Sequence, residues 1–256
     1  MSEIEKLERR LKERFVRAFA TYRLLADGDH VLVGLSGGKD SLLLLELMAG
    51  RARISHPQFS VEAIHVRMED VSYETDTSYL QTFCDHLQVP LHVVTTSFSA
   101  SRPRVKPGGE APAAGDGPAS AKPPCFLCSW NRRKQLFNMA QLLGCNKIAL
   151  GHHRDDIIHT ALMNLTFQGR FDTMPAILHM RKMPLSVIRP LCLIDEADIR
   201  RYAELARYQP LLKQCPYEHD THRAAVARLY ADMERMNPEA RFSVWKALEA
   251  EGKLCQ

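Results

Sequence analysis

The clearest chemical content in this 256-residue chain lies in two adjacent glycines followed by a lysine, an aspartate and a serine. Residues 36–41, Ser-Gly-Gly-Lys-Asp-Ser, follow the apolar run 30–35 and precede a second apolar run, 42–47. A short apolar run is typical of a buried parallel strand, and paired glycines allow a sharp turn that brings backbone N–H groups close to an anion. The positive end of the next helix would face the same point. The pattern predicts a strand, a phosphate-binding loop and a helix.

This loop differs from a Walker loop, which needs a glycine five residues before Gly38 and a Ser or Thr directly after the lysine. Those two positions hold Val33 and Asp40. An ordinary Gly-Gly turn with a surface lysine is the alternative. The coincidence of two hydroxyls, two glycines and a lysine between a strand and a helix favours the anion site.

A second polar cluster follows another predicted strand. Residues 147–151, Lys-Ile-Ala-Leu-Gly, lead into residues 152–156, His-His-Arg-Asp-Asp, at the start of a predicted helix. The carboxylates of Asp155 and Asp156, together with that of Asp40, could hold Mg²⁺ at the strand ends. The alternative is a helix start with acidic residues in its first turn.

The cysteines form a third group of candidate residues. Cys125 and Cys128 make a lone Cys-x-x-Cys, which is compatible with half a zinc site, a dithiol redox pair or part of an iron–sulfur site. A second pair is absent because the position three residues after Cys215 is Glu218. The remaining cysteines are expected to be spectator thiols: Cys84, Cys145, Cys192 and Cys255.

These candidate residues must be positioned by strands that alternate with helices. Helical spacing is found over residues 4–26, 73–87 and the segment after Cys128, and strands are predicted over 61–66, 91–95 and 186–189. Asp195 is the predicted N-cap of a further helix, and residues 221–252 are predicted to be helical with a break at 237–238. The alternation predicts an α/β fold with a doubly wound parallel sheet, whose ligands bind at the carboxyl ends of the strands.

The predicted partition is an N-terminal helix over 1–27, a catalytic domain over 28–215 and a helical segment over 216–256. Within the domain, residues 99–124 are rich in Pro, Gly, Ala and Ser, so they are expected to form a loop that is either disordered or ordered by substrate.

The composition, with 45% hydrophobic and 25% charged residues, predicts a globular protein. No apolar run approaches the ~20 residues that a spanning helix needs, so no membrane association and a cytoplasmic location are expected. The net charge of +4 only permits a polyanionic partner. Basic residues beside the Cys-x-x-Cys and further along are candidates to bind one: Arg132, Arg133, Lys134, Arg170, Arg181 and Lys182.

Residues 36–41 resemble the PP-loop of the ATP pyrophosphatases, which implies that family's fold with helical extensions at both ends. Further motifs extend the resemblance over residues 5–256: the Cys-x-x-Cys with its Arg-rich helix, residues 151–156, Met174-Pro175, Arg189-Pro190-Leu191 and Cys215-Pro216. Together they resemble the tRNA 2-thiocytidine synthetases. The related 2-thiouridine synthetases carry zinc-binding cysteine pairs near both chain ends, whereas this chain has no cysteine before Cys84.

The resemblance implies an ATP-dependent tRNA sulfurtransferase that adenylates the C2 oxygen of a pyrimidine, expected to be cytidine, and replaces it with sulfur. It also implies a [4Fe-4S] cluster held by Cys125, Cys128 and Cys215, and a sulfur donor such as a cysteine desulfurase or free sulfide. The family's last cysteine is replaced by Glu218, so this chain is a variant of the pattern. Two alternatives stay open: the same chemistry on another nucleoside or small molecule, or a non-catalytic iron–sulfur protein that binds RNA or acts as a sensor. A homodimer is also left open.

The resemblance and the chemistry together assign a catalytic or an ATP-binding role to each candidate residue. Lys39, Asp155 and Asp156 are the expected catalytic residues, with Lys39 neutralising phosphate charge and the two aspartates orienting the base. The expected ATP-binding residues are Ser36, Gly37, Gly38, Lys39, Asp40, Ser41, Val66, Gly151 and His152.

Overall fold

The computed structural model of the chain describes residues 2–69, 72–73, 77–97, 124–211, 213–214 and 221–256. The helices are α1 (Glu3–Tyr22), α2 (Lys39–Ala52), α3 (Ser78–Leu87), α4 (Pro124–Leu142), α5 (Arg154–Gln168), α6 (Glu196–Leu205), α7 (Thr221–Met236) and α8 (Ala240–Ala250). The strands are β1 (His30–Gly34), β2 (Ser60–Met68), β3 (Ser72–Tyr73), β4 (Leu91–Thr96), β5 (Lys147–Ala149), β6 (Ile177–His179), β7 (Ser186–Ile188) and β8 (Lys213–Gln214).

Six strands form one sheet in the order β4-β2-β1-β5-β7-β6. All of its strand pairs are parallel except β6 with β7, which is antiparallel. The chain builds outward from β1 to β2 and β4 on one side, and later adds β5 and β7 on the other. The strand order therefore reverses between β1 and β5, which is where open α/β sheets bind their ligands. The expected doubly wound α/β fold is confirmed.

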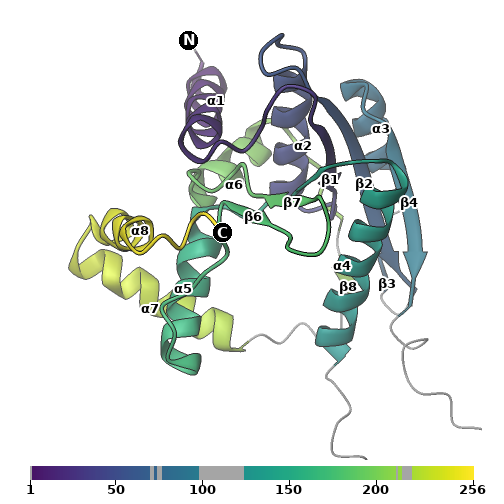
Figure 1. Cartoon of the computed structure of the whole chain (residues 1–256). Helices are drawn as coiled ribbons and strands as arrows, with labels where there is room; N and C mark the ends of the chain where they lie inside the picture. The colour runs from purple at the N-terminus through teal and green to yellow at the C-terminus, as the bar shows by residue number, and fades with distance from the viewer. Residues whose placement is uncertain (1, 70–71, 74–76, 98–123, 212, 215–220) are drawn as a thin grey trace, which may run out of the picture.

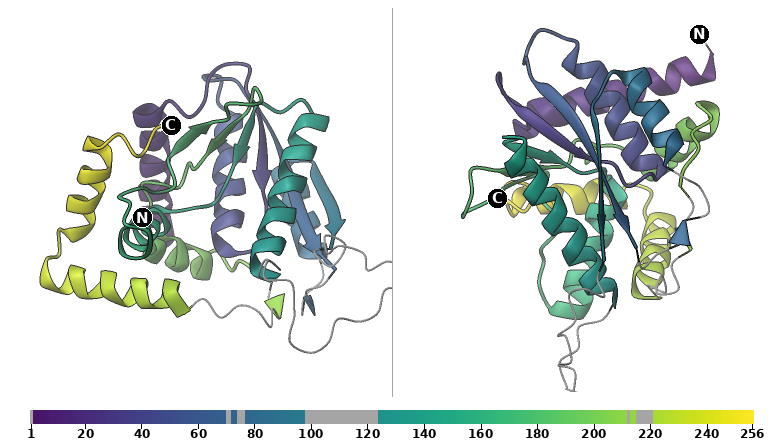
Figure 2. Two further views of the ribbon diagram at one scale, coloured as in Figure 1. Left: turned by 60° about the horizontal axis from the view of Figure 1, so that its bottom comes forward. Right: turned by 90° about the vertical axis from the view of Figure 1, so that its right-hand side faces the viewer.

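Helices cover both faces of this sheet, as Figures 1 and 2 show. In β1, Val31 and Val33 belong to the larger core cluster and Leu32 to a second cluster, as the alternation of strand side chains requires. The second cluster packs against α4, whereas the larger one packs against the apolar residues of α2. Continuous apolar strand sequences follow directly from this burial on two faces.

The helices at both ends of the chain share the larger core with the sheet. Leu11 and Phe15 of α1 are buried there, as are Trp245 and Leu248 of α8. At the far edge of the sheet, the backbone N–H of Gln256 donates to the carbonyl oxygen of Ile177 in β6. The C-terminal residues thus lie along β6 (Figure 1).

A buried carboxylate ties α2 to the α6 region. The hydroxyls of Tyr202 and Tyr208 donate hydrogen bonds to the two carboxylate oxygens of Glu46, at 2.6 and 2.7 Å. Both carboxylate oxygens are thereby satisfied by hydroxyl donors, as a partly buried charge requires.

Several predicted boundaries differ from the structure. Tyr73 lies in β3, so the helix predicted from residue 73 begins later, at Ser78. The two-residue strands β3 and β8, and the three-residue β6, are too short to show a periodic pattern and were not predicted. The predicted N-cap at Asp195 and the break at 237–238 are confirmed. Residues 99–123 of the predicted loop, Cys215 and Glu218 lie outside the described residues.

Candidate functional site

The loop between β1 and α2 turns sharply at Gly37, whose φ is +85°. A side chain there would be strained, and a Cβ atom would lie 2.6 Å from Cδ1 of Leu211. The backbone N–H of Leu211 also donates to the carbonyl oxygen of Gly37 at 2.9 Å. The loop is therefore closed on one side by a segment from far along the chain, and only glycine fits at this point.

Serine hydroxyls hold the loop in shape. The Ser41 Oγ, which is buried, accepts from the N–H of Gly37 at 3.1 Å and donates to the carbonyl oxygen of Gly38 at 2.9 Å. The Ser36 Oγ lies 3.1 Å from the Ser41 Oγ. No side chain of the described residues caps the N-terminus of α2, so its positive end faces the loop. This arrangement is suited to an anion.

Lys39 stands at the start of α2 with two acidic neighbours. Its Nζ lies 3.2 Å from the Asp40 carboxylate and 3.2 Å from Glu196 Oε1. Burial alone would lower the pKa of Lys39. The negative charges of Asp40 and Glu196 together outweigh this effect, so the pKa lies above its usual value. The ammonium is therefore charged at neutral pH and is held at the mouth of the loop.

The second predicted cluster meets the first in space. Gly151 follows β5, and a Cβ atom on it would lie 3.1 Å from the carbonyl carbon and oxygen of Asp40 and 3.2 Å from the backbone nitrogen of Ser41. Only glycine lets these backbones approach so closely without a shift. The structure thus brings together the two motifs that the sequence separates by more than a hundred residues.

His153 links the carboxylates of this second motif. It is buried and precedes α5, where its Nδ1 lies 3.5 Å from Asp155 Oδ2 and its Nε2 lies 3.4 Å from Asp156 Oδ2. Burial opposes protonation, but the hydrogen bond with Asp155 and the charges of Asp156 and Asp40 raise the pKa of His153. The sequence analysis did not single out His153. Its position just before a predicted helix, among acidic residues, was the available signal.

The two aspartates are held in different ways. Asp155 Oδ2 accepts from the backbone N–H of Glu196 at 2.8 Å, so Asp155 caps α6 in place of Asp195, which makes no side-chain cap. Burial raises the pKa of Asp155, but the hydrogen bonds from His153 and from the Glu196 N–H lower it to about 2. Asp156 bonds to the N–H of His153 and lies 3.6 Å from Arg223 Nη1.

The two remaining residues of the 152–156 run have different surroundings. Arg154 turns inward, where it donates to Asp195 Oδ1 at 2.9 Å and to the carbonyl oxygen of Leu193 at 2.7 Å. Arg154 is therefore structural. His152 has a buried Nδ1 with no hydrogen-bond partner in the described part of the chain. Burial, followed by the charge of Arg189, lowers the pKa of His152 to about 4, so its ring is neutral at pH 7.

A pocket of about 120 Å³ opens beside the loop, at the ends of β1, β2 and β5 under α4. Ser36 and Val66, both predicted to contact ATP, line it. The other lining residues were not predicted to contact ATP: Gly34, Leu35, Ile64, Arg132, Leu136 and Leu150. Its apolar walls beside a phosphate-type loop are suited to part of a nucleoside, such as the planar base.

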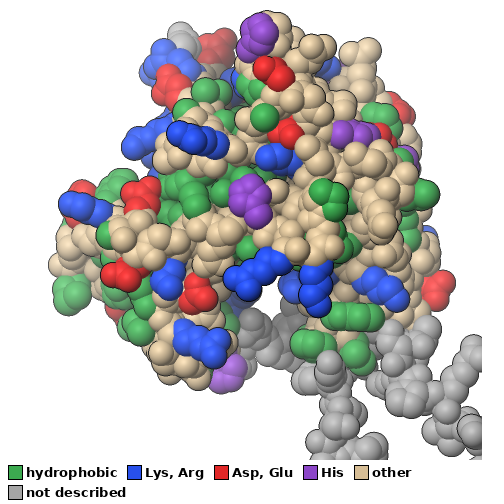
Figure 3. All heavy atoms as spheres, in the orientation of Figure 1, with side chains coloured by type: hydrophobic (Ala, Val, Ile, Leu, Met, Phe, Trp, Pro, Cys, Tyr) green, Lys and Arg blue, Asp and Glu red, His purple; other side chains and the backbone are tan. Residues whose placement is uncertain are grey.

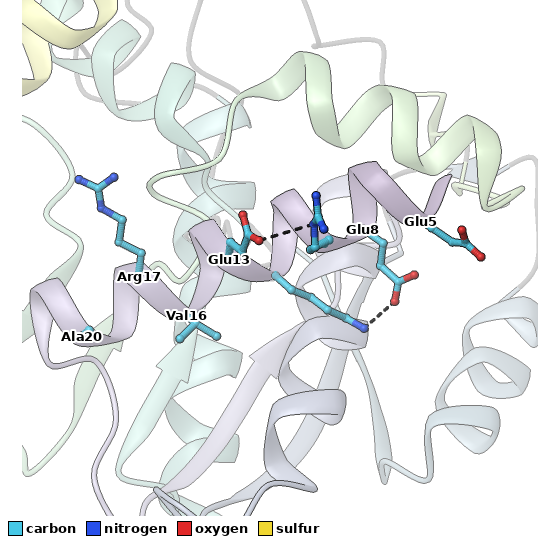
Figure 4. Close-up of a pocket in the computed structure, with 8 residues that line it drawn as sticks. Glu5, Glu8, Glu13, Val16, Arg17 and Ala20 are labelled. Carbon is cyan, nitrogen blue, oxygen red and sulfur yellow. Dashed lines mark hydrogen bonds and ion pairs between the residues drawn. The ribbon is translucent and has the colours of Figure 1, made fainter. Parts of the chain in front are cut away.

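A larger depression, of about 680 Å³, lies elsewhere and is lined by α1 alone. Figure 4 shows its charged side chains pairing with one another along the helix, Lys12 with Glu8 and Arg9 with Glu13. These pairs are largely exposed and one helix supplies them all. They form an ion-paired solvated face and not a site where groups converge.

The cysteine pair lies in the first turns of α4, at the carboxyl end of β2. Cys128 and Leu127 pack against Met68, the last residue of β2. The ladder of β3 with β8 begins four residues after Met68 and brings Gln214 opposite Ser72. Gln214 is thus paired with a residue four positions after Met68, and Cys215 lies outside the described residues. Sulfur ligands from this strand end fit an iron–sulfur or zinc centre.

The expected spectator thiols differ from this pair. Cys84, Cys145 and Cys192 are buried, and burial raises the pKa of Cys84 to about 12 and that of Cys145 to about 11. Burial also raises the pKa of Cys192. These thiols stay protonated at neutral pH, so they are poor metal ligands.

Acidic side chains do not assemble a metal site by themselves. In the part of the chain that the structure describes, no group of three His, Cys, Asp or Glu side chains could hold a metal ion. The carboxylates of Asp40, Asp155 and Asp156 already have Lys39, His153 and backbone partners. Asp40 Oδ1 is nevertheless buried with no hydrogen-bond partner in the described part of the chain, and the Mg²⁺ site of these aspartates stays a prediction. Among the described helices, none combines the length and apolarity needed to cross a membrane.

The sheet order, the Gly-Gly loop after β1 and the polar run after β5 define a protein of the PP-loop class. A family model described as PP-loop domain matches residues 4–106. In fold, the chain is similar to the U34-tRNA thiolase NcsA from Methanococcus maripaludis, whose structure contains a [4Fe-4S] cluster. That likeness has a TM-score of 0.72 at 23% identity and covers 96% of this chain and 79% of that one.

Sequence comparison identifies the family within this class. The chain is 34% identical over 245 residues to the tRNA-cytidine(32) 2-sulfurtransferase of Bordetella avium, covering 95% of this chain and 73% of the relative. It is 32% identical over 249 residues to the enzyme of the same name from Shewanella sp. (strain W3-18-1), covering 96% and 75%. The chain belongs to the tRNA-cytidine(32) 2-sulfurtransferase family.

Proposed function

We propose that this protein is an ATP-dependent tRNA sulfurtransferase that replaces the C2 oxygen of cytidine 32 with sulfur. The observation that carries the proposal is the contact of Gly151 with the backbone of Asp40 and Ser41. It puts an anion-binding loop and a pair of partly buried aspartates at one edge of the sheet, which suits adenylation of a base. The family membership supports cytidine as the base.

The first step is adenylation of the base. The C2 oxygen attacks the α-phosphorus of ATP, an O–P bond forms, and pyrophosphate leaves with the electrons of the broken P–O bond. The loop N–H groups, the positive end of α2 and the ammonium of Lys39 stabilise the charge that develops on the phosphates. The adenosine occupies the pocket lined by Ser36 and Val66. His152 borders this nucleotide as a neutral hydrogen-bonding group.

The second step releases AMP. A hydrosulfide attacks C2, a C–S bond forms, the C–O bond to AMP breaks, and the sulfur loses its proton. No oxidation or reduction is needed. Asp156 orients the base, and Asp155 acts with it by fixing His153 and the start of α6. Mg²⁺ enters with the ATP phosphates, with Asp40 as the protein ligand nearest to the loop.

Cys125, Cys128 and Cys215 are the residues that would hold an iron–sulfur cluster. When bound, a cluster with one iron free of protein ligands supplies a coordination position for sulfide. The protein's own part is to offer three thiolates, of which that of Cys128 packs at the end of β2, and to leave the carboxyl ends of β1 and β5 open to the base. The sulfide comes from a cysteine desulfurase or from solution, and a tRNA substrate implies a cytoplasmic location.

The proposal is tested with protein purified and reconstituted without oxygen, given ATP, sulfide and a tRNA transcript. Mass spectrometry of the digested tRNA should reveal 2-thiocytidine, and a transcript with uridine at position 32 should gain no sulfur. Lys39→Ala should fold like the wild type, because its partly exposed side chain lies outside the hydrophobic core and makes ion pairs. It should form no product, because it lacks the charge that faces the phosphates. Normal turnover by this variant, or sulfur on uridine alone, would contradict the proposal.

A further inference from the structure

Arg189 is a buried arginine at the carboxyl end of β7, in the same layer of strand ends as His152. β7 pairs with β5 so that Ile188 lies beside Ala149, and Arg189 follows at once. The side chain is 7% exposed. Its Nη1 donates to the carbonyl oxygen of Pro175, and its Nε has no hydrogen-bond partner in the described part of the chain.

Arg189 has no carboxylate partner among the described residues. Buried arginines are normally paired with an acid, because an uncompensated charge is costly to remove from water. Burial, together with the charge of Arg133, lowers the pKa of Arg189 to about 10, which still leaves the guanidinium charged at neutral pH. The described residues therefore hold a buried positive charge for which they provide no carboxylate counter-ion.

Arg133 of α4 is a second arginine whose charge reaches Arg189. It is exposed, five residues after Cys128, and it contributes to lowering the pKa of Arg189. The charge of Arg189 in turn acts on His152. Figure 3 shows Lys and Arg side chains on both sides of a hollow between α5 and α4. Two like charges without an acidic partner among the described residues favour an anion between them.

We propose that Arg189 and Arg133 bind one phosphate group of a substrate at the carboxyl end of β7. Arginine suits this role because its planar guanidinium presents several donors to phosphate oxygens. Arg133 is one of the basic residues expected from the sequence to contact a polyanion, and no role assigned above uses Arg189.

The position of the pair indicates an RNA phosphodiester as the source. β7 is two strands from β1, whereas the nucleoside pocket lies on the other side of β1, toward β2. A nucleotide whose base lies toward β2 and whose phosphates lie at Gly37 extends away from Arg189. This inference rests on the proposed function in that it takes tRNA as the substrate.

The test measures tRNA affinity of the full-length reconstituted protein at several NaCl concentrations, without turnover. Arg133→Ala and Arg189→Met should each weaken binding by at least about tenfold and reduce the slope of log affinity against log salt by about 0.7 to 0.9. Both tRNA transcripts, with cytidine or uridine at position 32, should be affected equally, because a phosphate contact reads no base. Arg189→Lys should recover part of the affinity.

The control is Arg9→Ala, which removes the same charge from the ion-paired face of α1 and should leave the affinity and the salt slope unchanged. ATP affinity is measured by titration on each variant. Loss of ATP affinity with unchanged tRNA affinity would show that the two arginines bind a phosphate of ATP, and it would overturn the assignment to an RNA phosphodiester. Unchanged affinity for both substrates in Arg133→Ala and Arg189→Met would overturn the site.

Thermal unfolding separates binding from a structural role. An unpaired buried charge destabilises the fold, so Arg189→Met should melt at or above the wild-type temperature. A large loss of stability in Arg189→Met, with normal tRNA affinity in Arg133→Ala, would show that Arg189 is structural. A wild type that binds tRNA through both arginines yet forms no thiolated base would refute the proposed function alone. Thiolation with unchanged affinity in both variants would refute this inference alone.

Discussion

Replacing Asp155 with asparagine should destabilise the protein by about 2 kcal/mol at neutral pH. The side chain is 17% exposed, and its carboxylate accepts from the N–H of Glu196 while facing His153. Asparagine keeps an acceptor oxygen for the α6 cap but removes the charge. The perturbation therefore isolates the electrostatic contribution of Asp155 and leaves the cap hydrogen bond in place.

The magnitude follows from the pKa of the carboxyl group. Burial alone would raise this pKa, but the hydrogen bonds from His153 and the Glu196 N–H move it from 3.8 down to about 2. Because one pKa unit corresponds to about 1.4 kcal/mol, the ionised carboxylate contributes about 2 kcal/mol to folding. A lowered pKa means that this stability is fully present above about pH 4. It is lost progressively as the pH falls from 3.8 toward 2.

Urea unfolding of the wild type and Asp155→Asn at pH 7 and pH 3 measures this difference. The gap should be about 2 kcal/mol at pH 7 and about half as large at pH 3. The pKa of His153, followed by NMR, should be lower in the variant, because the hydrogen bond to Asp155 raises it. Asp232→Asn, on an exposed ion pair of α7, is the control and should change stability little. A gap that is absent, or that does not narrow in acid, would refute the electrostatic account. If Asp155→Asn lost activity but kept the wild-type stability, the charge of Asp155 would act on the substrate and not on the fold.

Three further outcomes follow from the geometry. Gly37→Ala should cost about 1–3 kcal/mol in urea unfolding and weaken ATP binding, because a Cβ atom meets Leu211 and φ is positive; wild-type values for both would contradict the loop geometry. Glu46→Gln should lower the free energy of unfolding by about 1–3 kcal/mol, because an amide oxygen replaces only one of the two carboxylate oxygens that accept from Tyr202 and Tyr208. ATP affinity should stay unchanged. A stability equal to that of the wild type would show that these two hydrogen bonds are unimportant. Iron content per chain should survive in Cys145→Ala and fall in Cys128→Ala, and the opposite result would reverse the assignment of ligands.

The two polar motifs at the strand ends could be predicted from the sequence, because the patterns that mark them involve residues close together in the chain. Apolar runs, paired glycines and helix starts identified both motifs, and the rule for parallel sheets predicted that they would meet. The close approach of Gly151 to Asp40 follows from that rule once β1 and β5 are neighbours. The two- and three-residue strands left no such signal, since their pairing depends on distant partners.

Roles that depend on tertiary neighbours could not be predicted in this way. Asp155 lies in the first turn of one helix but caps another that begins forty residues later, and Asp195 at that cap pairs with arginines instead. In the sequence, Arg189 is recognisable only as part of the short motif Arg189-Pro190-Leu191. Its burial without an acidic partner among the described residues appears only in the folded structure, where the carbonyl oxygen of Pro175 accepts its hydrogen bond.

The closure of the loop by Leu211 bears on how the protein becomes active during synthesis. The ribosome releases β1, α2, β2, α3 and β4 before residue 211. A nascent chain that ends before Leu211 has the complete glycine loop but lacks the hydrogen bond and side chain that close it on one side. We expect strong retention of nucleotide only after nearly the whole polypeptide has emerged.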